Sequence, residues 1–178
     1  ARLPNTRLKP EHHEWRAQVR RFFDREVIPY ADQWDEDGCI PDELWPKSAE
    51  VGILGLGYPE EFGGVSEGID LWYSIILNEE MSRVAVGGLG ATLMVHGIGL
   101  PPVINFGSDD VKKMVAPPVL AGTKRISLAI TEPGAGSDVA HLTTTARLDG
   151  DHYVVNGSKT YITGGMNANW FTTAVRTG

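Results

Sequence analysis

The chain has 178 residues, 42% of them hydrophobic, and a formal net charge of −7 from 16 basic and 23 acidic residues. The length allows one large or two small domains, and the acidic balance argues against a nucleic-acid or anionic-lipid surface. No apolar run approaches the roughly 20 residues of a membrane span, and the single cysteine, Cys39, excludes an intrachain disulfide and fits a reducing compartment.

A stripe of apolar residues predicts the first helix, over residues 10–28. The stripe repeats at spacings of one, three and four residues and consists of Trp15, Val19, Phe22, Phe23 and Val27. Such spacing places these side chains on one helix face, which must be buried against a neighbour. The arginines of this segment fall mostly on the other face, where we interpret them as solvated and not as a phosphate site: Arg16, Arg20, Arg21 and Arg25.

Further helices are predicted over 41–51, 69–86, 88–106 and 108–120. The helix over 69–86 is the most central, because its wide apolar face predicts helical neighbours. That face is built from Leu71, Trp72, Ile75, Ile76 and, at its margin, Met81. We interpret Glu79 and Glu80 on this helix as an exposed pair or one salt-bridged carboxylate, and not as an acid–base site, because one acidic dipeptide on a helix is common.

The predicted helix over 88–106 is unusual in its glycines, which are Gly88, Gly90, Gly97 and Gly99. Each interior glycine costs a helix about 1 kcal/mol relative to alanine. Either close backbone packing or room for a ligand beside the helix explains them. His96 in this segment is interpreted as a core or surface histidine, because no second metal ligand lies three or four residues away.

Two glycine-containing boundaries frame the helical half. The loop over 55–64 is either a connector or a ligand-facing lip, and the loop alone does not decide between them. Ser108 is a predicted N-cap for the helix over 108–120, and Gly122 follows the end of that helix as a C-cap glycine does.

From Lys124 the apolar period changes to near two, which predicts strands over 126–131, 142–148, 152–156 and 170–176. Asp149-Gly150 and Asn156-Gly157 are typical of tight hairpin turns. Helices followed by an antiparallel sheet indicate the α+β class. We therefore predict an N-terminal all-α domain over 1–122 and an antiparallel sheet or barrel-like domain over 123–178. The last strand leaves an open edge, so we expect this second domain to be incomplete.

The stretch from Ile126 to Asp138 organises the chain. It begins as the β-prone run Ile-Ser-Leu-Ala-Ile-Thr and continues into the turn Glu-Pro-Gly-Ala-Gly-Ser-Asp. A strand that enters a glycine-rich turn brings backbone N–H groups together in a concave cluster that suits a phosphate. The stretch therefore predicts a turn that holds the phosphates of a cofactor, although a plain strand-to-turn corner is the alternative.

Two motifs together resemble the acyl-CoA dehydrogenase family in order and spacing. One is Ala-Ile-Thr-Glu-Pro-Gly-Ala-Gly-Ser-Asp at 129–138, and the other is Asn-Gly-Ser-Lys-Thr-Tyr-Ile-Thr-Gly-Gly at 156–165. The likeness includes the helices and the loop Tyr-Pro-Glu-Glu-Phe-Gly-Gly at 58–64, so it runs through nearly the whole chain. Members of this family are flavoenzymes with an N-terminal helical, a middle β and a C-terminal helical domain. The resemblance implies FAD as the cofactor and an acyl-CoA as the substrate.

The resemblance also implies which residues hold FAD: Leu128, Ala129, Ile130, Thr131, Gly136, Ser137, Tyr161, Ile162 and Thr163. Thr131 is expected at the polar edge of the flavin ring, and Gly136 and Ser137 at the pyrophosphate. Ser137 is also expected to bind the thioester-side portion of the substrate. Tyr161 is expected to cover one ring face, unless it is only a cross-strand aromatic, and the Thr163 hydroxyl to reach the N5 region.

Other polar residues near the motifs are given structural roles. Glu132 and Asp138 are acids beside a predicted diphosphate, which they would repel, so we interpret them as partners of backbone N–H groups or basic side chains. Lys159 is interpreted as a surface strand residue. His141 stands where the family usually has a small residue, and it either crowds the turn or reaches solvent.

The family's catalytic base is absent from this sequence. The base is a glutamate in the C-terminal helical domain, and Glu79, Glu80 and Glu132 match none of the family's base positions. We therefore predict no catalytic residue and no metal-ligand set in this chain, and we expect the isolated chain to be inactive.

The resemblance implies α,β-dehydrogenation of acyl-CoA thioesters, as in β-oxidation of fatty acids or amino-acid catabolism. It implies an acyl groove beside the glycine-rich helix, an electron-transferring flavoprotein as partner, and a homotetramer. The compartment would be the cytoplasm in a bacterium and the mitochondrial matrix in a eukaryote. Three alternatives remain: an acyl-CoA oxidase or flavin monooxygenase of the same superfamily, a non-catalytic flavin-binding subunit or fragment, and a helical interaction module without a cofactor.

Overall fold

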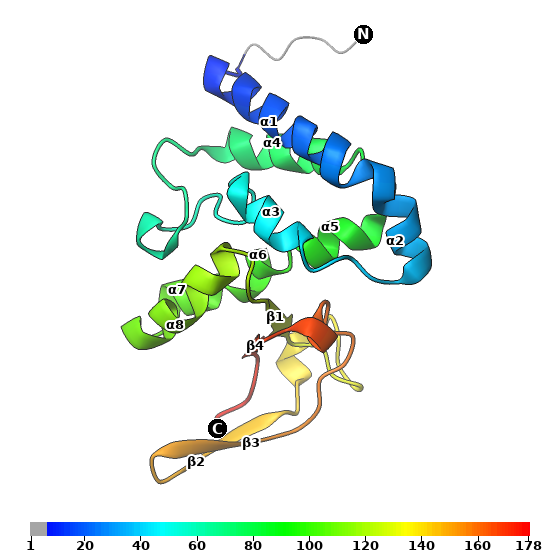
Figure 1. Ribbon diagram of the computed structural model, residues 1–178. Helices are drawn as coiled ribbons and strands as arrows, with labels where there is room; N and C mark the ends of the chain where they lie inside the picture. Colours follow the sequence, from blue (N-terminus) through cyan, green and yellow to red (C-terminus); the bar gives the residue numbers. More distant parts are fainter. Residues whose placement is uncertain (1–6) are drawn as a thin grey trace. The chain divides into compact units, whose positions relative to one another are not determined.

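The computed structural model describes residues 7–178 and divides them into two compact units. The first unit runs to Leu93 and includes Pro117–Thr123, and the second consists of Met94–Ala116 and Lys124–Gly178. The first contains α1 (Pro10–Glu26), α2 (Ala31–Asp37), α3 (Leu44–Glu50), α4 (Leu71–Met81) and α5 (Gly87–Leu93), with 3-10 turns at Ile28–Tyr30 and Glu60–Phe62 (Figure 1).

The second unit is mixed. It contains the short helices α6 (His96–Gly99) and α7 (Pro101–Phe106), 3-10 turns at Val139–His141 and Gly165–Asn167, and the strands β1 (Ile126–Ala129), β2 (Thr145–Asp149), β3 (His152–Asn156) and β4 (Trp170–Thr173). Helix α8 (Asp109–Leu120) has residues in both units. A helical part followed by a small β part confirms the predicted α+β class.

Helices α1 and α4 form the core pair of the first unit. All five residues of the predicted stripe are buried, four of them on α1 and Val27 directly after it. Ile76 and Leu77 on α4 are buried as well. The Trp15 indole N–H donates to the Tyr73 carbonyl at 3.1 Å, which satisfies its polar edge inside this contact. The apolar face predicted for α4 was wrong at one end, because Leu71 is the first residue of the helix and is 73% exposed.

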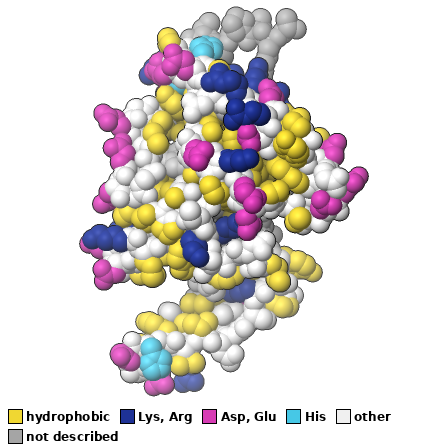
Figure 2. Space-filling view, viewed as in Figure 1, with side chains coloured by type: hydrophobic (Ala, Val, Ile, Leu, Met, Phe, Trp, Pro, Cys, Tyr) yellow, Lys and Arg dark blue, Asp and Glu magenta, His cyan; other side chains and the backbone are white. Residues whose placement is uncertain are grey.

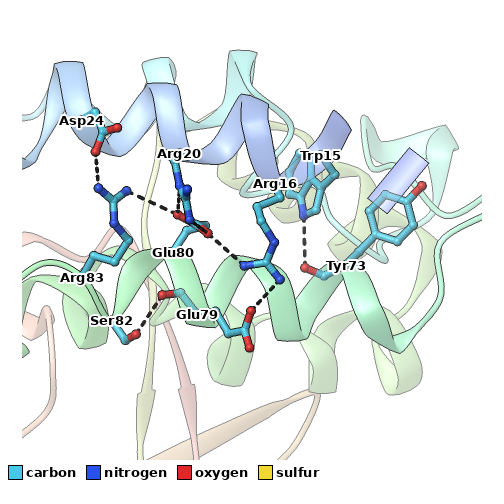
Figure 3. A network of polar contacts seen from close by, with 9 residues as sticks. All are labelled: Trp15, Arg16, Arg20, Asp24, Tyr73, Glu79, Glu80, Ser82 and Arg83. Atoms are coloured by element: carbon cyan, nitrogen blue, oxygen red, sulfur yellow. Dashed lines mark hydrogen bonds and ion pairs between the residues drawn. The ribbon is translucent and has the colours of Figure 1, made fainter. Parts of the chain in front are cut away.

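Glu80 on α4 is 1% exposed and is the centre of a charged network with α1 (Figure 3). Arg20 donates to both carboxylate oxygens at 2.8 Å, and Arg16 donates to Oε1 at 2.9 Å. Burial disfavours the charged carboxylate, but the hydrogen bonds from Arg20 and Arg16 outweigh burial and hold the pKa of Glu80 below its usual value. The salt-bridged alternative for the acidic dipeptide is therefore confirmed.

The prediction of a solvated arginine face on α1 is confirmed for three of its four arginines, which are exposed, and is wrong for Arg16. Arg16 also pairs with Glu79 at 2.5 Å, and its side chain is only 19% exposed. Arg83 joins Glu80 to Asp24 through contacts of 3.3 and 2.7 Å. The residues that pair with Arg16, Arg20 and Asp24 of α1 lie 59 to 64 residues away in sequence. The helical period of α1 therefore does not predict these contacts.

The predicted helix over 88–106 is three short helices, α5, α6 and α7. Pro101 and Pro102 open α7, because proline lacks the N–H that would continue α6 and fits the first turn of a new helix. Close packing explains one of the glycines: a Cβ on Gly99 would lie 3.2–3.4 Å from the backbone of Ile126 and Ser127 in β1. His96 is 5% exposed, as predicted for a core histidine.

The strands form two separate pairs. β2 and β3 are an antiparallel hairpin in which Thr145 faces Asn156, and Gly150 in its turn has a φ of +63°. β1 and β4 pair in parallel, with Ile126 opposite Trp170 and Ala129 opposite Thr173. The antiparallel prediction was therefore wrong for β1 and β4. The chain between them, which includes the hairpin, is long enough for the crossover that a parallel pair requires, and a period of two contains no information on direction.

The predicted turn at Asn156-Gly157 is absent from the described chain. Gly157 instead has a φ of +153°, and a Cβ there would overlap Thr144. The hairpin exposes four apolar side chains, those of Leu148, Tyr153, Val154 and Val155. Hydrophobic side chains are accordingly seen over the hairpin, at the lower end of the view in Figure 2. Among the described residues, no single helix is long and apolar enough to cross a membrane; only the bent pair of Gly87–Leu93 and His96–Phe106 passes that test together, by length and composition.

Candidate functional site

The first motif begins on β1 and turns immediately after it. Glu132 and Ala135 bond each other's backbones at 2.9 and 3.2 Å, which closes a tight turn over Pro133 and Gly134. No heavy atom lies within 4 Å of a Cβ built on Gly134 or Gly136, so this side of the turn is open. Gly136 and Ser137 are both exposed, as a site for a ligand's phosphates requires.

The second motif lies beside the first within the same unit. The Thr160 amide donates to the Thr131 carbonyl at 2.9 Å, and the Ser127 hydroxyl donates to the Thr163 carbonyl at 2.8 Å. The chain then turns at Gly164, which has a φ of +69°, and enters the 3-10 turn before β4. These bonds hold the residues after β1 next to the segment 159–163.

An open pocket of about 640 Å³ lies between the two motifs and β4. Its lining is mostly apolar and consists of Ala129, Lys159, Thr160, Tyr161, Ile162, Gly165, Met166, Phe171 and Thr173. The volume is within the ~300–1,000 Å³ range of small-molecule sites. Tyr161 and Met166 are 91% and 98% exposed at its rim, and an aromatic and a thioether side chain so exposed offer contact area to a flat ring.

The structure places the predicted flavin residues in two groups. Ala129, Tyr161 and Ile162 line the pocket, whereas Leu128, Ile130, Thr131, Gly136, Ser137 and Thr163 do not. Thr131 is half-buried and is connected to the lining through its carbonyl bond to Thr160, and Thr163 is exposed two residues beyond Tyr161. Tyr161 has a φ of 56°, a left-handed conformation that is uncommon outside glycine and costs about 1–3 kcal/mol. Such strain clusters at binding sites.

Sequence reasoning missed the pocket residues that come from β4 and from the turn before it. Met166, Phe171 and Thr173 line the pocket only because β4 lies parallel to β1, with Thr173 opposite Ala129. The alternation in residues 170–176 predicted a strand but not its neighbour, so the sequence contained no signal for this wall.

Glu132 has the structural role predicted for it. Its side chain is 3% exposed and accepts hydrogen bonds from the Thr143 amide and hydroxyl at 2.6 and 2.7 Å and from the Thr144 amide at 2.9 Å. It also pairs with Lys159 at 2.8 Å. Lys159 was wrongly interpreted as a surface residue, since its side chain is only 10% exposed.

These contacts predict an acid sensitivity. The hydrogen bonds from Lys159, Thr144 and Thr143 outweigh burial and hold the pKa of Glu132 well below its usual 4.5. Because the folded pKa is lowered, the stabilisation is fully present above pH 4.5 and is lost as pH falls below it. We expect Glu132→Gln to be less stable than the parent at neutral pH and to lose less stability on acidification. Urea midpoints measured from neutral pH to pH 3 test this, and parallel profiles for the two proteins would contradict it.

The remaining candidates do not form a site. Asp138 bonds His141 at 2.6 Å, and the His141 side chain is 79% exposed, so this histidine reaches solvent and does not crowd the turn. Among residues 7–178, no group of three or more histidine, cysteine or acidic residues is arranged to hold a metal.

The comparisons with known proteins identify the family. Residues 9–123 match the family model for the acyl-CoA dehydrogenase N-terminal domain, and residues 127–178 match that for the middle domain. The chain belongs to the acyl-CoA dehydrogenase family. The resemblance seen in the two motifs is thereby confirmed.

Three relatives illustrate the match. The mitochondrial long-chain specific acyl-CoA dehydrogenase of Sus scrofa is 39% identical over 155 residues, which is 87% of this chain and 35% of that protein. A probable acyl-CoA dehydrogenase structure from Mycobacterium abscessus superposes with a TM-score of 0.89 at 46% identity, over 96% of this chain and 45% of that one. A Bacillus anthracis acyl-CoA dehydrogenase complexed with FAD gives 0.83 at 33% identity, over 97% and 30%.

The chain spans 35% to 44% of the length of the curated relatives it matches. The matched parts are the helical region over 9–123 and the β region over 127–178, and the β region carries both motifs.

Proposed function

We propose that this chain forms the N-terminal helical domain, over 1–122, and the beginning of the middle β domain, over 123–178, of an FAD-dependent acyl-CoA dehydrogenase. The protein would oxidise the α,β bond of an acyl-CoA thioester. The observation that supports this most is the open pocket of about 640 Å³ between the two motifs, in a chain of this family.

The residues present fit FAD. Ile162, Phe171 and Met166 give the pocket the apolar walls that suit the flavin ring. The open backbone at Gly134 and Gly136 gives space for a diphosphate. FAD, when bound, supplies the acceptor for the substrate hydride. A related structure from Bacillus anthracis is described as complexed with FAD.

Individual residues have distinct proposed roles. Leu128 to Thr131 form one wall, with the Thr131 hydroxyl at the polar edge of the ring, and Thr163 bonds near N5. Gly136 and Ser137 bind the pyrophosphate through backbone and hydroxyl groups, and Ser137 also contacts the substrate. Tyr161 and Ile162 cover the ring. The catalytic base is a carboxylate outside these residues, and the acyl chain lies beside the glycine-rich helices.

We further propose that electrons pass to an electron-transferring flavoprotein and that the protein is a homotetramer. The proposed compartment is the mitochondrial matrix in a eukaryote and the cytoplasm in a bacterium; the name of the Sus scrofa relative describes that protein as mitochondrial. In an oxidase or monooxygenase of the same superfamily, the reduced flavin would instead pass its electrons to oxygen.

The test uses the complete gene product that carries this chain. We expect it to purify with bound flavin, which acyl-CoA bleaches under anaerobic conditions and an electron-transferring flavoprotein restores. Fast reoxidation by oxygen in a stopped-flow experiment would favour the oxidase. Bound flavin that no acyl-CoA reduces would favour a non-catalytic subunit, and a protein that binds no FAD would favour the interaction module.

A substitution in the pocket lining tests whether FAD binds in this pocket. We expect Ile162→Asp to weaken FAD binding by at least about tenfold, or about 1.4 kcal/mol, because it puts a charge into an apolar wall. Leu71→Asp is the matched control, since Leu71 is 73% exposed at the start of α4 in the other unit. Titration of the apoprotein with FAD measures both dissociation constants, and equal weakening in the two variants would contradict a flavin site at this pocket.

A further inference from the structure

Lys159 connects the two motifs from within the structure. Its ammonium donates to the Ile130 carbonyl at 2.9 Å and to Glu132 Oε1 at 2.8 Å. The adjacent Thr160 amide donates to the Thr131 carbonyl at 2.9 Å. Consecutive residues of one motif thus bond three consecutive residues of the other.

Glu132 extends this connection to a third segment. Its two carboxylate oxygens accept from the Thr143 amide and hydroxyl and from the Thr144 amide, so the segment directly before β2 and the two motifs meet at one carboxylate. Both members of the pair are buried, at 10% and 3% side-chain exposure. A buried ion pair is costly to desolvate, and it gives a unique arrangement only when its hydrogen bonds are satisfied, as here.

We propose that Lys159 and Glu132 are positioning residues that fix the spacing between segment 130–132 and segment 159–163, and thereby hold the walls of the flavin pocket in their binding geometry. Lys159 itself lines the pocket, and Tyr161 and Ile162 follow it directly. The expected consequence of this inference, tight FAD binding, rests on the proposed function. The fixed spacing between the two segments does not depend on FAD.

A merely structural role predicts a different pattern. If the pair only adds stability, Lys159→Met would lower the unfolding midpoint but leave FAD affinity unchanged at temperatures where the variant is folded. If the pair positions the walls, the folded variant has a looser pocket, so FAD affinity falls without global unfolding. Lys113→Met is the matched control, because Lys113 is an exposed lysine on α8.

The first experiment needs no ligand. Hydrogen exchange of the Thr160, Thr143 and Thr144 amides is measured in the FAD-free complete protein. We expect at least about tenfold faster exchange at these amides in Lys159→Met, with Lys113→Met unchanged, because local opening exposes bonds that the pair holds closed. Unchanged exchange at Thr160 in Lys159→Met would overturn the proposal.

The second experiment measures FAD affinity in folded variants. We expect Lys159→Met to weaken binding about tenfold and Lys159→Arg to restore part of it, because arginine keeps the charge but not the compact ammonium. The double variant Glu132→Gln with Lys159→Met should lose no more than the weaker-binding single variant if the two residues act as a unit. Full additivity, or unaltered affinity in Lys159→Met, would refute the positioning role while the proposed function stands. If the parent binds no FAD but exchange at Thr160 accelerates, the fixed spacing stands and the proposed function fails.

Discussion

Glu80→Gln is expected to destabilise the protein by about 3 kcal/mol, a large fraction of the stability of a typical domain. The carboxylate is 1% exposed and is the shared acceptor for Arg16, Arg20 and Arg83. Removal of its charge leaves the guanidinium groups between α1 and α4 without their counter-charge. Breaking a buried pair costs about 3–5 kcal/mol, and we expect the lower end because Arg20 and Arg83 are 49% and 36% exposed and can turn to water.

Glu79→Gln is the control on the neighbouring residue. Glu79 pairs with Arg16, and its side chain is 32% exposed, so its charge is closer to water than that of Glu80. We expect a loss of less than about 1 kcal/mol. Free energies of unfolding from urea titrations, followed by tryptophan fluorescence, compare the two variants. A Glu79→Gln loss equal to or larger than that of Glu80→Gln would show that the network is not centred on Glu80.

The network also shows where sequence reasoning was effective. The spacing of Trp15, Val19, Phe22, Phe23 and Val27 located the buried face of α1 correctly, because that face depends on the helical period alone. Arg16 was misassigned because its environment depends on Glu79 and Glu80 of α4, whereas the other three arginines of α1 are exposed, as predicted. The helical period predicts the face of the helix on which a side chain lies. It does not predict which residues of another helix contact that side chain.

In the candidate site, too, local features were predicted and long-range contacts were not. The two motifs predicted Ala129, Tyr161 and Ile162 as ligand-facing, and these residues line one pocket. Lys159 was misplaced because its burial depends on Glu132, which is 27 residues away. Phe171 and Thr173 were missed because a period of two does not say that β4 runs parallel to β1. The site residues that were predicted correctly belong to local motifs. Those that were missed take their place from contacts with a segment distant in sequence.

Gly122→Ala is expected to destabilise the protein by about 3 kcal/mol or more, for two reasons that add. Gly122 has a φ of +71°, a conformation that costs a residue with a side chain about 1–2 kcal/mol. A Cβ there would also overlap the backbone of Trp45 and Pro46, all within the first unit. Backbone atoms cannot turn aside as a flexible side chain does, so the two chain segments must separate.

Gly38→Ala isolates the first of these reasons. Gly38 has a φ of +66°, and no heavy atom lies within 4 Å of a Cβ built on it, so alanine there meets only the conformational cost of about 1–2 kcal/mol. The difference between the two variants in free energy of unfolding measures the close approach of residue 122 to the chain at Trp45. Equal losses would mean that this approach relaxes without cost and that Gly122 is only a C-cap. A larger loss in Gly122→Ala would show that the end of α8 needs glycine for contact as well as for conformation, which its place in the sequence after Leu120 does not reveal.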